Sequence, residues 1–143
     1  MIEFKKGDMF KEHSDNIICT VNSVGVMGTG VAKEVKNRFP EASKYYVYKC
    51  KKGLISEGDV WICDDIYTSV IFFATKNHWR NDSNYSMIDI GLTKLVGLIY
   101  KNNIHSLTMP KIGCGNGGLD WDIVKDMIKR KLGNCKCDIT IYE

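Results

Sequence analysis

The sequence predicts an α/β layered domain with a mixed, largely parallel sheet, and two observations lead to this prediction. Short apolar runs typical of strands alternate with segments whose apolar residues recur at helical spacing. Seven of the 13 glycines fall in two loops, residues 25–30 and 113–118, each of which follows a strand-like run and precedes a helical segment. Because 143 residues fit one compact unit, we expect a single domain over residues 1–143.

The N-terminal half contains two predicted strands and two predicted helices. Residues 2–5 alternate between apolar and polar side chains, and residues 16–21 form a near-continuous apolar run typical of a strand covered on both faces. After the first glycine loop, apolar residues recur at helical spacing until the chain reaches Pro40. Proline suits the first turn of a helix, so a second helix is expected from Pro40 to about residues 52–53.

The C-terminal half continues the alternation. Strands are predicted at residues 59–63, 69–75, 106–112 and 138–142. A long amphipathic helix is expected from about residue 85 to residue 100, and a last helix follows Asp120, a favourable N-cap residue, and extends to Leu132. In such sheets ligands bind beyond the carboxyl ends of the strands, so the two glycine loops can share one crevice.

Composition and charge exclude several classes of protein. No apolar run approaches the roughly 18 residues of a membrane helix, and the N-terminus lacks a signal-peptide pattern, so we expect a cytoplasmic protein without membrane contact. The net charge of +3 permits an anionic ligand but does not by itself indicate DNA binding. The densest basic group is interpreted as the solvated end of a helix, with a nucleic-acid patch as the alternative; it comprises Lys44, Lys49, Lys51 and Lys52.

The cysteines and histidines predict neither disulfides nor a metal site. The six cysteines form no C-x-x-C pair, and without a secretion signal we expect all of them to be reduced. Cys135 and Cys137 lack a second ligand pair nearby, and the three histidines are dispersed. We also expect a monomer.

The two glycine loops together predict a clamp for a diphosphate. A strand followed by a glycine loop and a helix N-terminus turns backbone N–H groups toward a phosphate, and the helix dipole adds to the attraction. Glycine serves here because it adopts positive φ freely and lets a ligand approach the backbone closely. One such loop is a weak signal, whereas two in one small domain indicate a clamp.

Both loops resemble the ligand loops of the macrodomains. Residues 20–32 (TVNSVGVMGTGVA) resemble the first loop and residues 109–121 (MPKIGCGNGGLDW) the second, and the order of elements agrees over essentially the whole chain. The resemblance implies a three-layer α/β/α sandwich that binds ADP-ribose, as ligand or product, without a cofactor or metal. The ADP-ribose-binding residues that it implies are Asp8, Met9, Gly25, Val26, Met27, Gly28, Gly30, Val31, Ala32, Thr75, Gly113, Cys114, Gly115, Asn116, Gly117, Gly118 and Leu119. Asp8 matches a carboxylate that bonds the adenine amino group in the family, with a simple turn residue as the alternative.

Residues 75–80 (TKNHWR) resemble a run found in macrodomain antitoxins that remove ADP-ribose from thymidine bases in DNA. The resemblance implies that Lys76 is catalytic; a solvated lysine at a strand end is the alternative. An ammonium can stabilise or protonate the leaving base, whereas a neutral amine can attack the anomeric carbon, and both remain open. Asn22 matches an asparagine near the scissile bond in that group, with a structural asparagine that bonds the loop backbone as the alternative. His78, Trp79 and Arg80 either contact nucleic acid or belong to the packing and surface of the domain.

Two departures from the family argue against protein substrates. A branch that cleaves glutamate-linked ADP-ribose pairs its lysine with an aspartate in the second loop, and this chain has Gly117 there. Asp120 is interpreted as a helix cap rather than a replacement. A second branch, with a catalytic aspartate after a longer glycine run, is poorly matched by Gly30 and its neighbours.

The predicted function is therefore an ADP-ribosyl glycohydrolase that removes thymidine-linked ADP-ribose from single-stranded DNA, with Lys76 and Asn22 as catalytic residues. ADP-ribose and ADP-ribosylated single-stranded DNA are the expected partners. An ADP-ribose 1''-phosphate phosphatase is one alternative, although no His or Asp is well placed for it. A non-catalytic ADP-ribose reader module is the other.

Overall fold

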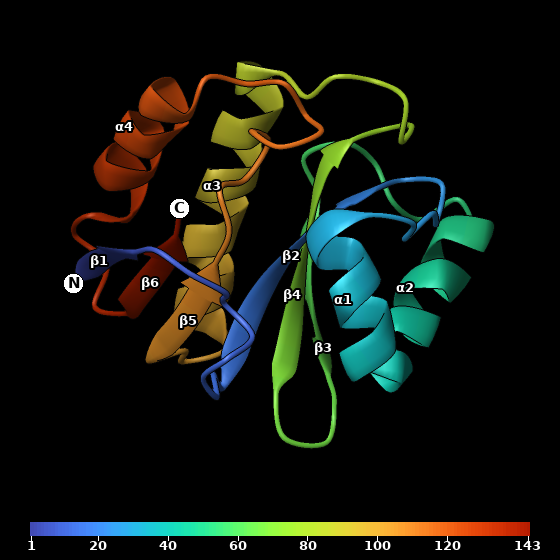
Figure 1. Cartoon of the computed structure of the whole chain (residues 1–143), viewed down its shortest axis with the longest axis horizontal. Coiled ribbons are helices and arrows are strands. Elements are labelled where there is room, and N and C mark those ends of the chain that lie inside the picture. The colour runs from blue at the N-terminus through green and yellow to red at the C-terminus, as the bar shows by residue number, and fades with distance from the viewer.

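The structure, a computed structural model, describes residues 1–143 as a three-layer α/β/α sandwich, as predicted (Figure 1). Its strands are β1 (Ile2–Lys5), β2 (Asn16–Asn22), β3 (Val60–Asp64), β4 (Ser69–Lys76), β5 (Ser106–Met109) and β6 (Asp138–Tyr142). Its helices are α1 (Gly30–Arg38), α2 (Pro40–Lys51), α3 (Tyr85–Lys101) and α4 (Trp121–Leu132). Helices α1 and α2 cover one face of the sheet, and α3 and α4 cover the other.

The sheet is mixed and largely parallel, which confirms the predicted fold class. Its strand order is β1-β6-β5-β2-β4-β3, and the β3–β4 hairpin is its one antiparallel pair. From β2 the chain crosses over α1 and α2 toward β3, whereas from the neighbouring β5 it crosses over α4 on the other face toward β6. The carboxyl ends of β2 and β5 therefore flank a topological switch point, where α/β sheets open a crevice for ligands.

Two hydrophobic cores hold the sheet between its helices, and alternating side chains of the central strands supply both. In β2, Ile18 packs toward α3 and α4, while Ile17 and Cys19 pack toward α1 and α2. Helix α3 packs tightly on β4 at Gly91, where an added Cβ would lie 2.2 Å from the ring of Phe73. This contact explains a glycine inside a long helix, a position that its helix propensity disfavours.

Strand boundaries differ from the predicted ones by one residue at β2, β3 and β4 and by three residues at β5. Strand β5 ends at Met109 rather than at residue 112. Pro110 follows directly and has no N–H to donate to a neighbouring strand, so the ladder stops there. Strand β4 continues one residue beyond the prediction, to Lys76.

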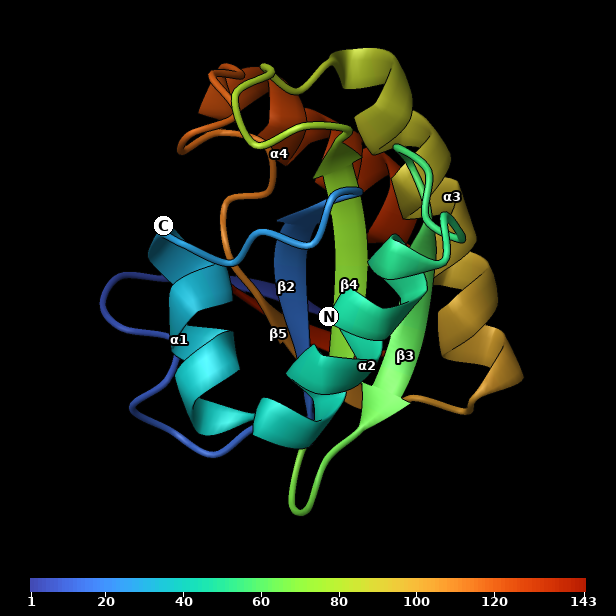
Figure 2. The same cartoon turned by 90° about the vertical axis from the view of Figure 1, so that its right-hand side faces the viewer.

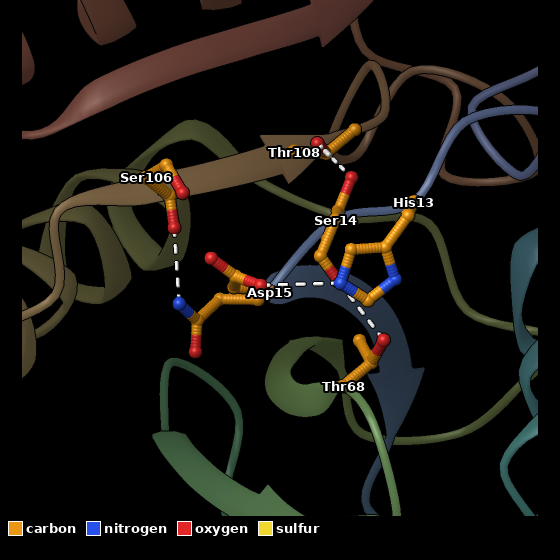
Figure 3. Close-up of polar contacts among 7 residues, drawn as sticks. His13, Ser14, Asp15, Thr68, Ser106 and Thr108 are labelled. Carbon is orange, nitrogen blue, oxygen red and sulfur yellow. Dashed lines mark hydrogen bonds and ion pairs between the residues drawn. The ribbon is translucent and has the colours of Figure 1, made fainter.

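Polar contacts tie the N-terminal loop to the amino ends of the central strands (Figure 3). The hydroxyls of Ser14 and Thr108 lie 2.6 Å apart, and the hydroxyl of Thr68 donates to the backbone carbonyl of Ser14 at 2.9 Å. The His13 ring lies 3.1 Å from the Asp15 carboxylate, and both side chains are exposed. These contacts lie at the end of the strands opposite to the glycine loops, and they fix where β2 begins.

None of the four helices is both long enough and apolar enough to cross a membrane.

Candidate functional site

A cavity of about 870 Å³ opens at the carboxyl ends of the central strands, between the two glycine loops. Its floor includes Thr20 and Val21 of β2 and Thr75 of β4, and its walls come from the first loop with the start of α1 and from the second loop. The structure thus brings together most of the predicted site residues: Asn22, Val26, Gly28, Gly30, Val31, Ala32, Thr75, Lys76, Trp79, Arg80, Gly113, Gly115, Asn116 and Gly117.

The buried side chain of Asn22, a residue that is 5% exposed, supports the first glycine loop. The Asn22 Oδ1 accepts hydrogen bonds from the backbone N–H groups of Val24 (3.1 Å), Gly25 (3.0 Å) and Val26 (3.3 Å). Its Nδ2 donates to the Val26 carbonyl at 2.9 Å, and the Tyr46 hydroxyl donates to the Asn22 backbone carbonyl at 2.8 Å. The structure therefore shows the loop-backbone contacts that were the alternative interpretation of Asn22.

The start of α1 presents unpaired backbone donors to the cavity. The residue before the helix, Thr29, makes no side-chain hydrogen bond to the first turn, and that turn holds no acidic residue. Gly30, Val31 and Ala32 line the cavity with N–H groups that have no partner one turn earlier. Across the cavity, Asn116 Nδ2 of the second loop donates to the Thr29 hydroxyl at 3.0 Å and joins the two loops. An anion is favoured at this helix N-terminus.

The second glycine loop leaves no room for a side chain at Gly117. A Cβ there would lie 2.4 Å from the carbonyl oxygen of Gly113 and 2.6 Å from the hydroxyl of Ser83. The Ser83 N–H also donates to the Gly117 carbonyl at 2.9 Å, so the loop is fastened to the segment before α3. By contrast, a Cβ at Gly115 would meet nothing within 4 Å. In this loop conformation, no carboxylate can replace Gly117 without moving the backbone.

Lys76 stands at the rim of the cavity, beside the first loop. It is the last residue of β4 and pairs with Asn22 across a local register shift, so the two residues are neighbours at the carboxyl ends of adjacent strands. The Lys76 Nζ donates to the Trp79 carbonyl at 3.1 Å and forms no ion pair. An ammonium has three donors, so two of them can be directed to a ligand in the cavity.

The residues that follow Lys76 form an exposed aromatic and basic group. The rings of His78 and Trp79 stack with centroids 5.3 Å apart, and the Arg80 guanidinium lies 4.6 Å from the Trp79 centroid. Trp79 is 44% exposed, and both Trp79 and Arg80 line the cavity. Trp79 is therefore a surface residue rather than part of either core.

Some predicted ligand residues lie outside the cavity wall. The Asp8 carboxylate accepts from the Phe10 N–H at 2.9 Å within its own turn. Met9 and Met27 are buried in the core beneath α1 and α2, and Cys114 and Leu119 pack against the core on the other face. The others outside the lining are Gly25, His78 and Gly118.

The cavity also includes residues that were not predicted: Thr20, Val21, Thr29, Pro110, Lys111, Tyr142 and Glu143. Tyr142 and Glu143 follow from the position of β6 next to β5, which places the carboxyl end of β6 at the same edge of the sheet. A hydrogen bond from the Trp121 indole at 2.8 Å and the nearby Lys125 ammonium hold the pKa of Glu143 below its usual range. No local sequence pattern indicates these residues, because their place in the cavity depends on the pairing of β6 with β5.

The second glycine loop itself contains a half-buried thiol, that of Cys114. Burial raises the pKa of Cys114 to about 11, although the Lys111 ammonium lowers it in part. Its Sγ donates to the Ile112 carbonyl at 3.3 Å. All six cysteines are free, and the fold assembles no cluster of three or more His, Cys, Asp or Glu side chains suited to a metal.

Two glycine loops and a helix N-terminus surround one cavity at the switch point of a mixed sheet. This arrangement is typical of an α/β domain that binds a phosphate-bearing ligand. The family comparison specifies the class further. Residues 18–128 match the family model of the Macro domain, so the chain belongs to the macrodomain family.

Several relatives of the chain are bacterial proteins. The chain is 39% identical over 132 residues to the DNA ADP-ribosyl glycohydrolase of Mycobacterium tuberculosis, an alignment that covers 90% of this chain and 38% of that protein. It matches the macrodomain of Mycobacterium tuberculosis DarG with a TM-score of 0.94 and 37% identity, over 99% of this chain and 97% of that one. It matches Thermosipho africanus DarTG in complex with ADP-ribose with a TM-score of 0.89 and 34% identity, over 99% of this chain and 41% of that one. The chain thus spans about two-fifths of the length of the bacterial DNA ADP-ribosyl glycohydrolases that it matches.

Proposed function

We propose that this macrodomain is an ADP-ribosyl glycohydrolase that removes ADP-ribose from a thymidine base in single-stranded DNA. The observation that carries the proposal is Lys76, an amine free of ion pairs at the rim of the loop-lined cavity. Its support is the similarity to proteins named DNA ADP-ribosyl glycohydrolases at 35–39% identity.

The loops supply the binding half of the site. The diphosphate of ADP-ribose would lie between the start of α1 and the second loop, where backbone N–H groups and the helix dipole favour negative charge. These contacts hold a part of the substrate that does not react. Binding energy realised there positions the glycosidic bond against the catalytic group.

Lys76 supplies the chemical half. Water adds its hydroxyl to the anomeric carbon of the distal ribose, the bond from that carbon to the base nitrogen breaks, and the base takes up a proton. The Lys76 ammonium would stabilise negative charge on the departing base or donate that proton. We prefer this role to nucleophilic attack, because a side chain has no room at Gly117 and no carboxylate forms an ion pair with Lys76 to take up its proton.

Asn22 acts on this reaction through the loop that it holds. Four of its hydrogen bonds set the path of residues 24–26, and Val26 lines the cavity. The exposed group of His78, Trp79 and Arg80 would contact the base and the neighbouring phosphate of the DNA strand.

The test offers three substrates side by side: a thymidine-ADP-ribosylated oligonucleotide, glutamate-ADP-ribosylated protein and ADP-ribose 1''-phosphate. We expect turnover of the first alone. Lys76→Ala should lower kcat by about 100-fold or more while the Kd for ADP-ribose changes less than about threefold. The control is Lys136→Ala, an exposed lysine outside the cavity.

Each other outcome identifies an alternative. Turnover of the phosphate alone indicates a phosphatase, and ADP-ribose binding without any turnover indicates a reader module. Full activity of the Lys76→Ala protein contradicts the role of Lys76. If borohydride traps a covalent adduct between Lys76 and the substrate during turnover, Lys76 acts as an attacking amine and not as an ammonium that assists the leaving base.

A further inference from the structure

A second cavity of about 470 Å³ lies between α1 and α2, directly across the first glycine loop from the ADP-ribose cavity. We call it the α1–α2 groove; its lining includes Gly25, Met27, Lys36, Lys44, Tyr48 and Lys51. Figure 2 shows α1 and α2 side by side in front of the sheet, with the first glycine loop leading from β2 to α1. The lysines and Tyr48 of the groove are not among the residues expected or proposed above to bind ADP-ribose.

One loop separates the groove from the catalytic end of the ADP-ribose cavity. Val26 and Gly28 line the ADP-ribose cavity, whereas the alternating residues Gly25 and Met27 line the groove. Asn22 is the neighbour of Lys76 in the sheet, and its Oδ1 accepts from the Gly25 N–H at 3.0 Å. A polymer attached at the catalytic end therefore has only this loop to cross before it reaches the groove.

The groove lies in the basic part of the molecule. Residues 30–53 carry seven lysines and arginines against two glutamates, a net charge of +5, although the whole chain carries only +3. The ion pairs within α1 and α2 are Arg38–Glu34 and Lys44–Glu41, so Lys36 and Lys51 are exposed ammonium groups without a carboxylate partner. A surface of this kind attracts a polyanion.

Aromatic side chains alternate with the lysines on α2. Tyr45 and Tyr48 are 52% and 53% exposed and stack with ring centroids 6.2 Å apart. The Lys49 and Lys52 ammonium groups each lie 5.8 Å from a tyrosine centroid. Exposed aromatic faces beside cations are the combination that binds single-stranded nucleic acid, because bases stack on the rings while phosphates meet the cations.

The spacing of the groove lysines fits a phosphodiester backbone. Lys44 and Lys51 are seven residues apart, which places them on one side of α2 and about 10 Å apart along its axis. Because this separation exceeds the rise of roughly 3.4 Å per charge that each strand has in a duplex, the two lysines can meet different phosphates of an extended strand. Lys36 faces them from α1 across the groove.

We propose that the α1–α2 groove binds the backbone of the single-stranded DNA that flanks the modified base. This proposal rests on the proposed function, and it assigns a role to the basic group for which the sequence left two interpretations. The groove would add affinity for polymeric substrates without contacting ADP-ribose. It would therefore distinguish a modified strand from a modified mononucleoside.

The test compares Lys36→Gln/Lys51→Gln with the control Lys101→Gln/Lys136→Gln, which removes the same charge from exposed lysines without ion pairs. An unmodified single-stranded oligodeoxynucleotide is titrated between about 0.05 and 0.2 M salt. Loss of two phosphate contacts should lower the salt slope by about 1.4 and weaken binding about 25-fold at 0.1 M salt. The control should bind as the wild type does.

Two further measurements separate this proposal from the proposed function. With the modified oligonucleotide, the groove variant should raise KM by a similar factor at unchanged kcat, and its Kd for ADP-ribose should stay the same. If the wild-type protein cleaves none of the substrates, the proposed function is wrong. The salt titration with unmodified DNA still tests the groove in that case. Equal salt slopes for the groove variant and the wild type overturn the groove proposal. Tighter binding of a poly-glutamate peptide of equal charge, with the same dependence on the two lysines, overturns it as well.

Discussion

Replacement of Asn22 by alanine tests whether this residue acts as a loop support. The change removes three hydrogen bonds from backbone N–H groups of residues 24–26 and one to the Val26 carbonyl, besides the bond from the Tyr46 hydroxyl, which keeps its contact with the Asn22 backbone carbonyl. At about 1 kcal/mol each, the four bonds amount to about 4 kcal/mol. Val24 and Val26 are 47% and 42% exposed, so water replaces part of this loss. We therefore expect the free energy of unfolding to fall by about 2–3 kcal/mol.

Urea unfolding followed by tryptophan fluorescence measures this loss, and Tm should fall by about 10 °C. Because the loop loses its support, the affinity for ADP-ribose should fall together with stability, which calorimetry detects. The control for stability is Asn116→Ala, which removes a single exposed side-chain bond to Thr29 and should cost less than about 0.5 kcal/mol. If Asn22→Ala abolishes turnover while stability and ADP-ribose affinity remain those of the wild type, Asn22 is a catalytic group and the loop-support interpretation is wrong.

Three further predictions concern packing and charge. Gly117→Ala should destabilise the protein by about 1–3 kcal/mol in urea unfolding and weaken ADP-ribose binding, because its Cβ would lie 2.4 Å from a loop carbonyl. Within α3, Gly91→Ala should destabilise by a similar amount or more, whereas Gly97→Ala, whose Cβ meets nothing within 4 Å, should stabilise by up to about 1 kcal/mol; equal effects of the two would contradict the packing of Gly91 on an aromatic ring. The pKa of Glu143 is lowered, so its hydrogen bond with Trp121 contributes fully to stability at pH values above the ordinary carboxyl pKa. This contribution is lost as the pH falls through the lowered pKa. The indole N–H resonance of Trp121 should shift in that acid range, and Glu143→Gln should abolish the titration.

Local patterns were sufficient to predict most elements because each is encoded within a short window. The apolar runs of β2 and β4 are buried on both faces, as continuous apolar strands require. Asp120 caps α4 as predicted, since its carboxylate accepts from the Asp122 N–H at 2.9 Å. The end of β5 was wrong by three residues, because hydrophobicity alone does not register the missing N–H of Pro110.

The candidate site was predictable only where the sequence itself is unusual. The two glycine loops are visible in the sequence itself, and the strands that precede them, β2 and β5, are adjacent in the sheet. The contribution of Tyr142 depends on β6 lying next to β5, which is a long-range pairing that no local pattern shows. The hydrogen bonds of Asn22 to the first glycine loop are likewise a property of the folded loop, because each partner in that loop is a backbone group.

The position of Gly117 connects the binding loop to the choice of chemistry. The carbonyl of Gly113 and the hydroxyl of Ser83 close the space where a side chain would stand, so an aspartate there would require a different loop path. The same packing fastens the loop to the segment before α3, through the Ser83 N–H and the Gly117 carbonyl. A loop that is fixed in this way binds phosphate with backbone donors but offers no carboxylate to Lys76. In the proposed reaction, Lys76 would therefore act as a cation to which this loop supplies no carboxylate, which suits a leaving group that departs with negative charge, as a nucleic-acid base does.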